Sequence, residues 1–380
     1  MRGPFGTYAL GAFFGGLLFV GAKAQMKVSS FDGPVTKEEL KSFNDYVVTL
    51  KPATDNKGNQ WVQGHSGEQT KAMGLVYQMA GQQETLDHML RFCDAVLSER
   101  NDLAKAPVGQ HKIWTGGIDP VWPNDVTKKP TQTGGGRRRP LWRYLYGSSR
   151  DLSQAGGFLD EQQYLKTITG SFERKQDVLC QGLAYMGGKP VPWNQQMMFN
   201  YAFMNLCSAH RILNDNPELL GKYKSILTAS IDWFFHGGGV QTKKSKKGST
   251  VYDWCYTVLR TTGEDSNHGA LDVAGFYRTY IDGNYDITAD QMKPFANMFV
   301  DVMTLGKEKY VGTVDGKTDG DGHAKPTKNI RSGYLFLAEF WFDACKSMMS
   351  ADLSVGGKGT GSADGFSRFL WVKNQRAKAK

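Results

Sequence analysis

Cysteine is scarce in this 380-residue chain, and its five cysteines are widely spaced. No C-x-x-C pair occurs, so the sequence contains neither a zinc-ribbon motif nor a thioredoxin-type redox motif. Because five is an odd number, at least one thiol is free or pairs between chains, and the spacing does not reveal which cysteines would pair. Cys207 stands in an apolar stretch and is expected to be buried as a small hydrophobic residue.

Long hydrophobic runs are absent beyond residue 24, where no segment approaches the roughly 20 apolar residues that span a bilayer. Residues 1–24 are different: Arg2 precedes an uncharged, mostly apolar run over residues 8–20, and Ala22-Lys23-Ala24 resembles a signal-peptidase site. We therefore predict that residues 1–24 are a signal peptide and that the mature protein is secreted and soluble. The alternative is an uncleaved membrane anchor.

The sequence also lacks a recognisable nucleic-acid-binding motif, although its formal net charge is +9. Removing residues 1–24 takes away two basic residues and no acid, which leaves 9 − 2 = +7. A basic exported protein suits an anionic polysaccharide, and we expect neither nucleic acid nor, after cleavage, a membrane as its partner. Basic clusters at 137–139, 243–247 and the C-terminal end are expected to be solvated; the sequence does not indicate the oligomeric state.

Clear strand alternation is scarce, whereas apolar residues recur at helical spacing along much of the chain. Helices are predicted over residues 66–80, 83–100, 194–213, 217–231, 268–281, 288–304 and 331–349. Pairs of helices joined by loops indicate an all-α fold, an (α/α) toroid or incomplete barrel of helical hairpins with a groove at one end. We assign residues 25–370 to one such catalytic domain and residues 371–380 to a basic tail.

Residues 101–159 are rich in glycine, proline, tryptophan and arginine, and this is a long stretch for a loop in a compact domain. Such loops are usually functional or disordered, and the aromatic residues favour the first. We expect Trp114 or Trp122 to line the groove together with Trp193 and Trp254.

A cluster of polar side chains stands in GEDSNHGALD, residues 263–272, at the start of a helix that otherwise reads as buried. Backbone N–H groups at a helix start favour an anion, so Asn267 and His268 are placed to bind a carboxylate. Asp272, one turn after His268, or Asp265 would orient the imidazole. The alternative is structural: Asp265 or Ser266 caps the helix and His268 is only a satisfied polar residue.

Three other segments place polar or aromatic side chains at comparable positions. In VYDWCYT, alternation puts Tyr252, Trp254 and Tyr256 on one face, which is typical of a sugar platform but equally of a core-facing strand. The other two segments lie at helix starts and contain Trp193, Asn194 and Gln195 in the first, and Arg331 and Tyr334 in the second.

The order of these segments, from PWNQQ through YDWCY, EDSNHGALDV and ITADQMKPFANMFV to LAEF, resembles the helical-toroid polysaccharide lyases that cleave alginate and glucuronan. The likeness covers roughly residues 190–342, and Phe340 stands where that pattern has tyrosine. The resemblance implies an all-helical toroid that cleaves a uronic-acid polysaccharide by β-elimination.

β-Elimination requires a group that neutralises the C6 carboxylate, a base that removes the C5 proton and an acid for the leaving oxygen. The residue types present suit these roles. The candidate catalytic residues are His268, Tyr252, Tyr256, Asn194 and Arg331. The candidate substrate-binding residues are Asn267, Trp254, Trp193, Gln195, Tyr334 and Glu264.

Two alternatives remain open at the level of the sequence: a glycoside hydrolase of similar fold that uses Glu264 or Asp265, and a non-catalytic glycan-binding protein. No cofactor or metal is expected. The acidic stretch 315–323 offers oxygen ligands for Ca²⁺, but it reads more simply as a surface loop. The sequence does not indicate which uronan is cut, or whether cleavage is endo or exo.

Overall fold

The computed structural model describes residues 25–52, 60–98, 100–106, 109–110, 112, 117–118, 185–186, 189–190, 192–257, 263–306, 309–318, 325–328, 330–342 and 362–379. The predicted signal peptide, the Arg137–Arg139 cluster, and Trp114 and Trp122 lie outside these residues. No helix within the described part of the chain is long and apolar enough to cross a membrane. Cys93, Cys207 and Cys255 are free thiols there, and Cys207 is buried as predicted.

Helices dominate the described residues, which confirms the predicted fold class. The α-helices are α1 (Lys37–Val47), α2 (Gln60–Ala80), α3 (Gln83–Ser98), α6 (Trp193–Leu213), α7 (Pro217–His236), α8 (Ser266–Asp282), α9 (Ala289–Met298) and α11 (Ala363–Lys378). A π-helical turn, η2 (Phe299–Met303), extends α9, and a 3₁₀-helix, η4 (Ser332–Glu339), stands where an α-helix was predicted over 331–349.

The helix starts follow from local capping. The Asn216 side chain accepts the backbone N–H of Leu219 at 3.1 Å, and Pro217 occupies the first helical position, where its missing N–H costs nothing. At the start of α9, Thr288 and Gln291 form a reciprocal capping box. These two starts were readable from the sequence because each depends on residues three apart.

Helices α6 and α8 lie side by side and run in the same direction. A Cβ on Gly275 of α8 would meet Met197 of α6, which explains the glycine at this contact. Further along, Arg278 lies over the ring of Tyr201 at 5.5 Å. Residue numbers therefore rise together along both helices, and their N-termini share one end of the molecule.

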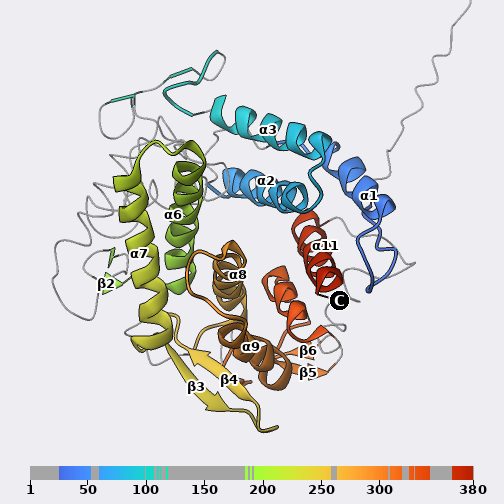
Figure 1. Cartoon of the computed structure of the whole chain (residues 1–380), viewed down its shortest axis with the longest axis vertical. Coiled ribbons are helices and arrows are strands. Elements are labelled where there is room, and N and C mark those ends of the chain that lie inside the picture. The colour runs from blue at the N-terminus through green and yellow to red at the C-terminus, as the bar shows by residue number, and fades with distance from the viewer. Residues whose placement is uncertain are drawn as a thin grey trace, which may run out of the picture.

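Helices α2, α6, α8 and α11 surround the middle of the molecule, with α1, α3 and α7 outside them (Figure 1). Consecutive helices pack as pairs, α2 with α3 and α6 with α7, while α2 also packs on α11 and α6 on α8. The inner helices α2 and α6, each followed by an outer partner, are part of an incomplete (α/α) toroid.

The strands form small antiparallel ribbons outside the helical layers. β3 (Val240–Lys244) pairs with β4 (Thr250–Trp254), and two shorter pairs join β1 (Tyr185–Met186) to β2 (Lys189–Pro190) and β5 (Thr304–Gly306) to β6 (Lys309–Tyr310). The basic residues Lys243 and Lys244 lie on the exposed strand of the first ribbon, as solvated positions. β4 also carries the alternating Tyr252 and Trp254, so the strand alternative for that segment is the right one.

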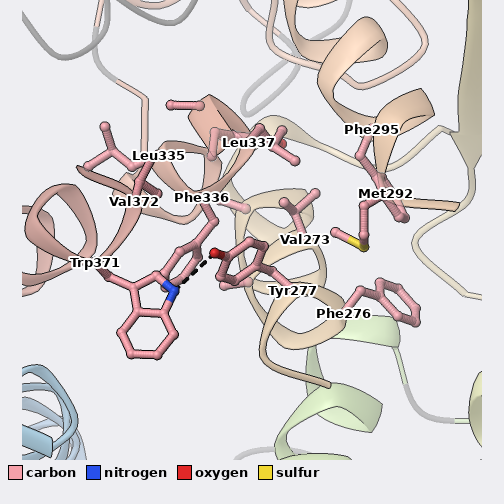
Figure 2. Packing of buried hydrophobic residues seen from close by; sticks show 14 of the residues in the cluster. Val273, Phe276, Tyr277, Met292, Phe295, Leu335, Phe336, Leu337, Trp371 and Val372 are labelled. Carbon is pink, nitrogen blue, oxygen red and sulfur yellow. Dashed lines mark hydrogen bonds between the residues drawn. The ribbon is translucent and has the colours of Figure 1, made fainter. Parts of the chain in front are cut away.

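The core is rich in aromatic side chains and joins α8 to η4, α9 and α11. The Tyr277 ring stacks on Phe336 with centroids 4.3 Å apart, and Trp371 Nε1 donates to the Tyr277 hydroxyl at 3.0 Å (Figure 2). The same hydroxyl donates to Glu339. A buried hydrogen bond satisfies polar atoms that would otherwise be costly inside an apolar cluster.

Helix α11 corrects the predicted basic tail. Residues 371–378 continue this helix, and its Trp371, Val372 and Lys373 are buried. Lys373 Nζ lies 2.9 Å from both carboxylate oxygens of Glu39 in α1, and both side chains are almost fully excluded from solvent. The sequence suggested a tail because the segment is basic. In the structure Trp371 and Val372 pack in the core, and Lys373 pairs with Glu39 of the first helix.

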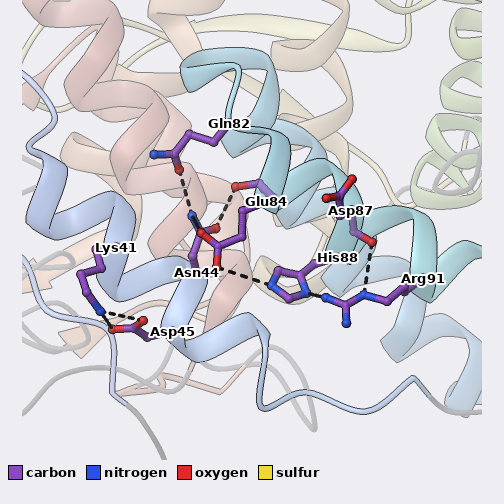
Figure 3. A network of polar contacts seen from close by, with 9 residues as sticks. Lys41, Asn44, Asp45, Gln82, Glu84, Asp87, His88 and Arg91 are labelled. Atoms are coloured by element: carbon purple, nitrogen blue, oxygen red, sulfur yellow. Dashed lines mark hydrogen bonds and ion pairs between the residues drawn. The ribbon is translucent and has the colours of Figure 1, made fainter.

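A second polar seam joins α1 to α3. Asn44 Nδ2 donates to Gln82 Oε1 at 2.9 Å, and the buried Thr85 hydroxyl donates to Asn44 Oδ1 at 2.8 Å. Figure 3 shows this network with Glu84 and His88 beside it. The N-terminal helices are thus connected by specific hydrogen bonds as well as by apolar packing.

Candidate active site at the start of helix α8

The polar cluster of residues 263–268 is fixed between β4 and the segment 311–315. Glu264 N donates to the Trp254 carbonyl at 2.9 Å, and the Glu264 carbonyl accepts from Val314 N at 2.9 Å. Ser266 N donates to the Gly312 carbonyl at 2.8 Å. Backbone pairing on both sides therefore holds the first residues of α8 in a rigid position.

Asp265 has two functions at this point. One carboxylate oxygen, Oδ1, accepts the backbone N–H groups of Asn267 and His268 at 2.9 Å each, so Asp265 is the N-cap of α8. The other oxygen, Oδ2, lies 2.5 Å from His268 Nδ1. The helix-cap alternative and the imidazole-orienting role predicted from the sequence are thus both filled by one side chain.

Asp265 is held in its ionised form. Burial alone would raise its pKa, but the hydrogen bonds from the His268 ring and backbone and from Asn267 N outweigh burial and lower the pKa below the usual value. Side-chain exposure is 18% for Asp265 and 27% for His268. The pair is therefore a charged carboxylate and an imidazole that solvent, and a ligand, can reach.

Beneath this pair lie two fully buried carboxyl groups, Glu264 and Asp272. Burial, followed by the charge of Asp272, raises the pKa of Glu264 to about 10, so Glu264 is protonated at neutral pH and donates to Asp272. Burial also raises the pKa of Asp272, to about 7. Glu264 Oε1 accepts Asp265 N at 2.9 Å, and Asp272 Oδ2 accepts Trp254 Nε1 at 3.0 Å.

Asp272 therefore does not orient His268, which was one of the two sequence predictions. Its carboxylate is occupied by the Trp254 indole and by the Glu264 carboxyl, one turn below the imidazole. The spacing of four residues placed Asp272 and His268 on one helix face correctly, but a closer donor, Trp254, takes the carboxylate.

Two further candidate residues lie beside the Asp265–His268 pair. The rings of Tyr256 and His268 are 5.1 Å apart between centroids. Trp193 N donates to the Tyr256 carbonyl at 3.2 Å, which brings the start of α6 to the same place. Asn194 follows there, is 5% exposed, and its Oδ1 has no hydrogen-bond partner among the described residues.

Several predicted site residues are instead part of the core, which contradicts the expected sugar platform. Trp254 and Trp193 are each 2% exposed, and Trp193 packs edge-on against Phe234 with centroids 4.8 Å apart. Tyr252 is buried against Phe295. An alternating aromatic pattern suits a sugar platform and a core-facing strand equally, and here α7 and α9 cover that face.

Tyr334 and Arg331 also differ from expectation. Tyr334 is fully buried and donates its hydroxyl to the Ser266 carbonyl at 3.0 Å, so it supports the start of α8 from below. Arg331 is exposed at the N-cap of η4, and its guanidinium makes no hydrogen bond or ion pair with the described residues. Asn267 and Gln195 are partly buried at the starts of α8 and α6, where the sequence placed them.

One group of possible metal ligands occurs in the described part of the chain. Glu264, Asp265 and His268 each offer one atom within 4.8 Å of the others. The internal hydrogen bonds among these groups already engage the Asp265 carboxylate, His268 Nδ1 and Glu264 Oε1. Protonated Glu264 is a poor ligand for a cation, so the arrangement fits proton transfer better than metal binding.

A set of charged residues deeper between the inner helices was not predicted from the sequence. These are Lys71 of α2, Arg278 of α8 and Arg368 of α11, with Tyr201 of α6 among them. The available signal was a basic residue in the middle of a helix that otherwise reads as buried, as in GFYRTY. That signal is weak because such residues usually reach solvent.

Two solved structures are similar to this chain at low sequence identity. No family model and no curated protein matches the chain. Among solved structures, a "Glycosyl hydrolase family 88 from Bacteroides vulgatus" is 13% identical, with 90% of this chain and 99% of that chain covered and a TM-score of 0.39. An "unsaturated glucuronyl hydrolase specific for heparin" is 12% identical, with 88% and 94% covered and a TM-score of 0.40.

Proposed function

We propose that this chain is a glycoside hydrolase that acts on uronic-acid glycans, with Asp265 and His268 as its catalytic pair. The observation that carries the proposal is an ionised, partly exposed carboxylate bound to an imidazole. Glycoside hydrolysis commonly combines an ionised carboxylate with a group that donates a proton. Glu264 is buried, so of the two acids considered from the sequence, Asp265 is the one placed to meet substrate.

Each group has a definite task in the reaction. His268 donates its proton to the glycosidic oxygen as the bond to the anomeric carbon breaks, and the imidazole then accepts a proton from the attacking water. Asp265 stabilises the imidazolium and the positive charge that develops on the sugar ring. Glu264 and Asp272 act as positioning residues, because their hydrogen bonds fix Asp265 N and the Trp254 indole.

A second function, β-elimination, is favoured by the contact between Tyr256 and His268. A tyrosine and a histidine side by side supply an acid and a base for removal of the C5 proton. The structure leaves Tyr256 as the one tyrosine of the three considered that is only partly buried, since Tyr252 and Tyr334 are in the core. The glycan-binding alternative is weakened, because Trp193 and Trp254, two of the tryptophans predicted to line the groove, are buried.

One assay separates these functions. The protein is incubated with alginate, glucuronan and other uronans, and with oligosaccharides that end in an unsaturated uronic acid. New reducing ends without a rise in near-ultraviolet absorbance identify hydrolysis, and a rise in both identifies elimination. No product from any substrate, at a protein concentration that would reveal slow turnover, contradicts both enzymatic proposals.

A matched control exists within the chain. His236 also has its Nδ1 on an aspartate, Asp232 Oδ1, at 2.8 Å, but both side chains are exposed on α7. His268→Ala is expected to abolish turnover and His236→Ala to leave it unchanged. Equal loss in both variants would show that a histidine–aspartate pair contributes to folding and not to catalysis.

We further propose that residues 1–24 direct export, because an apolar run precedes Ala22-Lys23-Ala24. N-terminal sequencing of secreted protein is expected to begin at or near Gln25. Recovery of the full-length chain from a membrane fraction would contradict cleavage.

A further inference from the structure

A basic cluster of one buried and two half-buried side chains lies among the inner helices, away from the candidate active site. It contains Lys71 from α2, Arg278 from α8 and Arg368 from α11. Arg278 is ten residues after His268 on α8, which corresponds to about 15 Å along the helix axis. Residues far apart in the sequence thus converge where α2, α6, α8 and α11 surround the middle of the molecule (Figure 1).

The ring of Tyr201 on α6 contacts two of the three basic side chains. Lys71 Nζ lies 5.1 Å from its centroid and the Arg278 guanidinium 5.5 Å from it. Two cations beside one aromatic ring gain from its negative face, but they also repel each other across it. Tyr201 is 8% exposed, and its hydroxyl has no hydrogen-bond partner among the described residues.

Positive charge exceeds negative charge in this cluster. When Lys71 is protonated, three cations, Lys71, Arg278 and Arg368, face two acids, Asp364 and Glu68, which leaves 3 − 2 = +1. Asp364 is committed to Arg368 at 2.8 Å and to the Ser332 hydroxyl at 2.5 Å. Arg278 makes no ion pair within the described part of the chain.

Donor groups in the cluster also exceed acceptors. Arg278 Nε and Nη1 and Arg368 Nε are buried without a hydrogen-bond partner among the described residues, and Arg368 as a whole is 5% exposed. Buried guanidinium donors are normally paired, and an unpaired one is costly. Four polar atoms of this cluster, including the Tyr201 hydroxyl, therefore lack a hydrogen-bond partner among the described residues.

We propose that this cluster is a binding site for one oxyanion, a carboxylate or an inorganic sulfate or phosphate, held by Arg278, Arg368, Lys71 and the Tyr201 hydroxyl. A single negative charge would balance the excess charge, and oxyanion oxygens would accept from the guanidinium N–H groups in the fork geometry that arginine favours. The proposal does not depend on the proposed glycosidase activity.

The protonation of Lys71 is linked to such binding. Burial, followed by the charge of Arg368, lowers the pKa of Lys71 to about 7, with Arg278 acting in the same direction and Asp364 and Glu68 opposing. A bound anion favours the charged lysine, so binding is expected to weaken as pH rises through 7.

The test measures ligand-dependent stability and does not require turnover. Thermal unfolding and calorimetric titration of the full mature chain are carried out at pH 6 with sodium sulfate, sodium phosphate and sodium glucuronate. Sodium chloride at matched ionic strength controls for screening. At least one of the three oxyanions is expected to raise the melting temperature in a saturable way that chloride does not reproduce.

A rise in melting temperature with glucuronate alone would identify a carboxylate site. A rise with sulfate or phosphate alone would identify an inorganic-anion site. If none of the three oxyanions raises the melting temperature more than chloride does, the proposal is overturned. Ordered water would then be the partner of these donors.

Variants place the effect at the cluster. Arg278→Met is expected to raise the dissociation constant of the oxyanion roughly tenfold or more, because charged hydrogen bonds are lost. Arg211→Met is the matched control, since Arg211 is an arginine of α6 paired with Asp282 at 3.5 Å and outside the cluster. Tyr201→Phe removes only the unpartnered hydroxyl and gives a second, milder variant if Arg278→Met does not fold. Unchanged binding in the folded variants would contradict the site.

Discussion

The carboxylate of Asp265 binds the imidazole of His268 at 2.5 Å with one oxygen and caps helix α8 with the other. The two roles are separable because they use different atoms. Loss of the cap costs about 1 kcal/mol of folding free energy, whereas loss of the imidazole removes a proton-transfer group. Substitutions at the two positions therefore report on different properties of the protein.

His268→Ala is expected to lower kcat by about 10² to 10⁴, since that is the typical contribution of an acid–base group. The melting temperature should change little, because the Asp265 cap accepts backbone N–H groups that remain. Kinetics on the substrate identified by the assay panel, with thermal unfolding in parallel, test this. An early-melting variant with near-normal turnover would show that His268 is structural.

Glu264→Gln tests the buried carboxyl pair through the pH dependence of stability. The folded-state pKa of Glu264, about 10, lies above its unfolded value of 4.5. The contribution of this group to folding stability is therefore fully present below pH 4.5 and is lost as pH rises toward 10. Asp272, raised from 3.8 to about 7, acts in the same direction. The variant keeps a donor to Asp272 without an ionisable group.

Relative to wild type, Glu264→Gln is therefore expected to gain stability as pH rises from 5 to 9, by up to about 1.4 kcal/mol per pH unit for one retained proton. Chemical denaturation at several pH values measures the difference. Glu218→Gln, at an exposed position in the first turn of α7, is the control. If the free energy of unfolding changed with pH in the same way for wild type and Glu264→Gln, the conclusion that Glu264 retains a proton would be contradicted.

Gly333→Ala is expected to destabilise the protein by about 3 kcal/mol or more through overpacking. A Cβ at this position would come within 1.9 Å of the Ala270 carbonyl oxygen, so η4 and α8 would have to separate. Gly221→Ala is the matched control: it lies in α7 with nothing within 4 Å of its Cβ, and a gain of about 1 kcal/mol is expected there. Equal effects would show that the two elements do not pack this closely.

Lys373→Met should cost about 3 kcal/mol, because it leaves the buried Glu39 carboxylate without its cation. Lys41→Met removes an exposed lysine that pairs with Asp45 at 2.6 Å and should cost at most about 1 kcal/mol. Urea unfolding of the two variants compares them directly. A Lys373→Met protein as stable as wild type would return residues 371–380 to the role of a dispensable tail.

The helices were predictable from the sequence wherever a local signal defined them. The Asn216–Pro217 start and the Thr288–Gln291 box depend on residues close in the chain, and both were correctly identified. Strand β4 was ambiguous, because alternating Tyr252 and Trp254 suit a core strand and a sugar platform alike. Only α7 and α9, packed on its face, decide between the two.

The contacts within the candidate site were predictable from the sequence only in part. His268 and Asp265 lie within four residues, so their contact follows from helix geometry. Asp272 turned to Trp254 instead, a partner 18 residues earlier that no local pattern indicates. Lys71, Arg278 and Arg368 come from three helices, so their convergence required the tertiary structure.

The contact between Glu39 and Lys373 joins residues that are 334 positions apart. During synthesis Glu39 leaves the ribosome long before Lys373 is added, because 334 positions separate them. Helix α1 therefore has no cation for its buried carboxylate until helix α11 has been made. Any truncated chain that ends before α11 would leave that carboxylate unpaired.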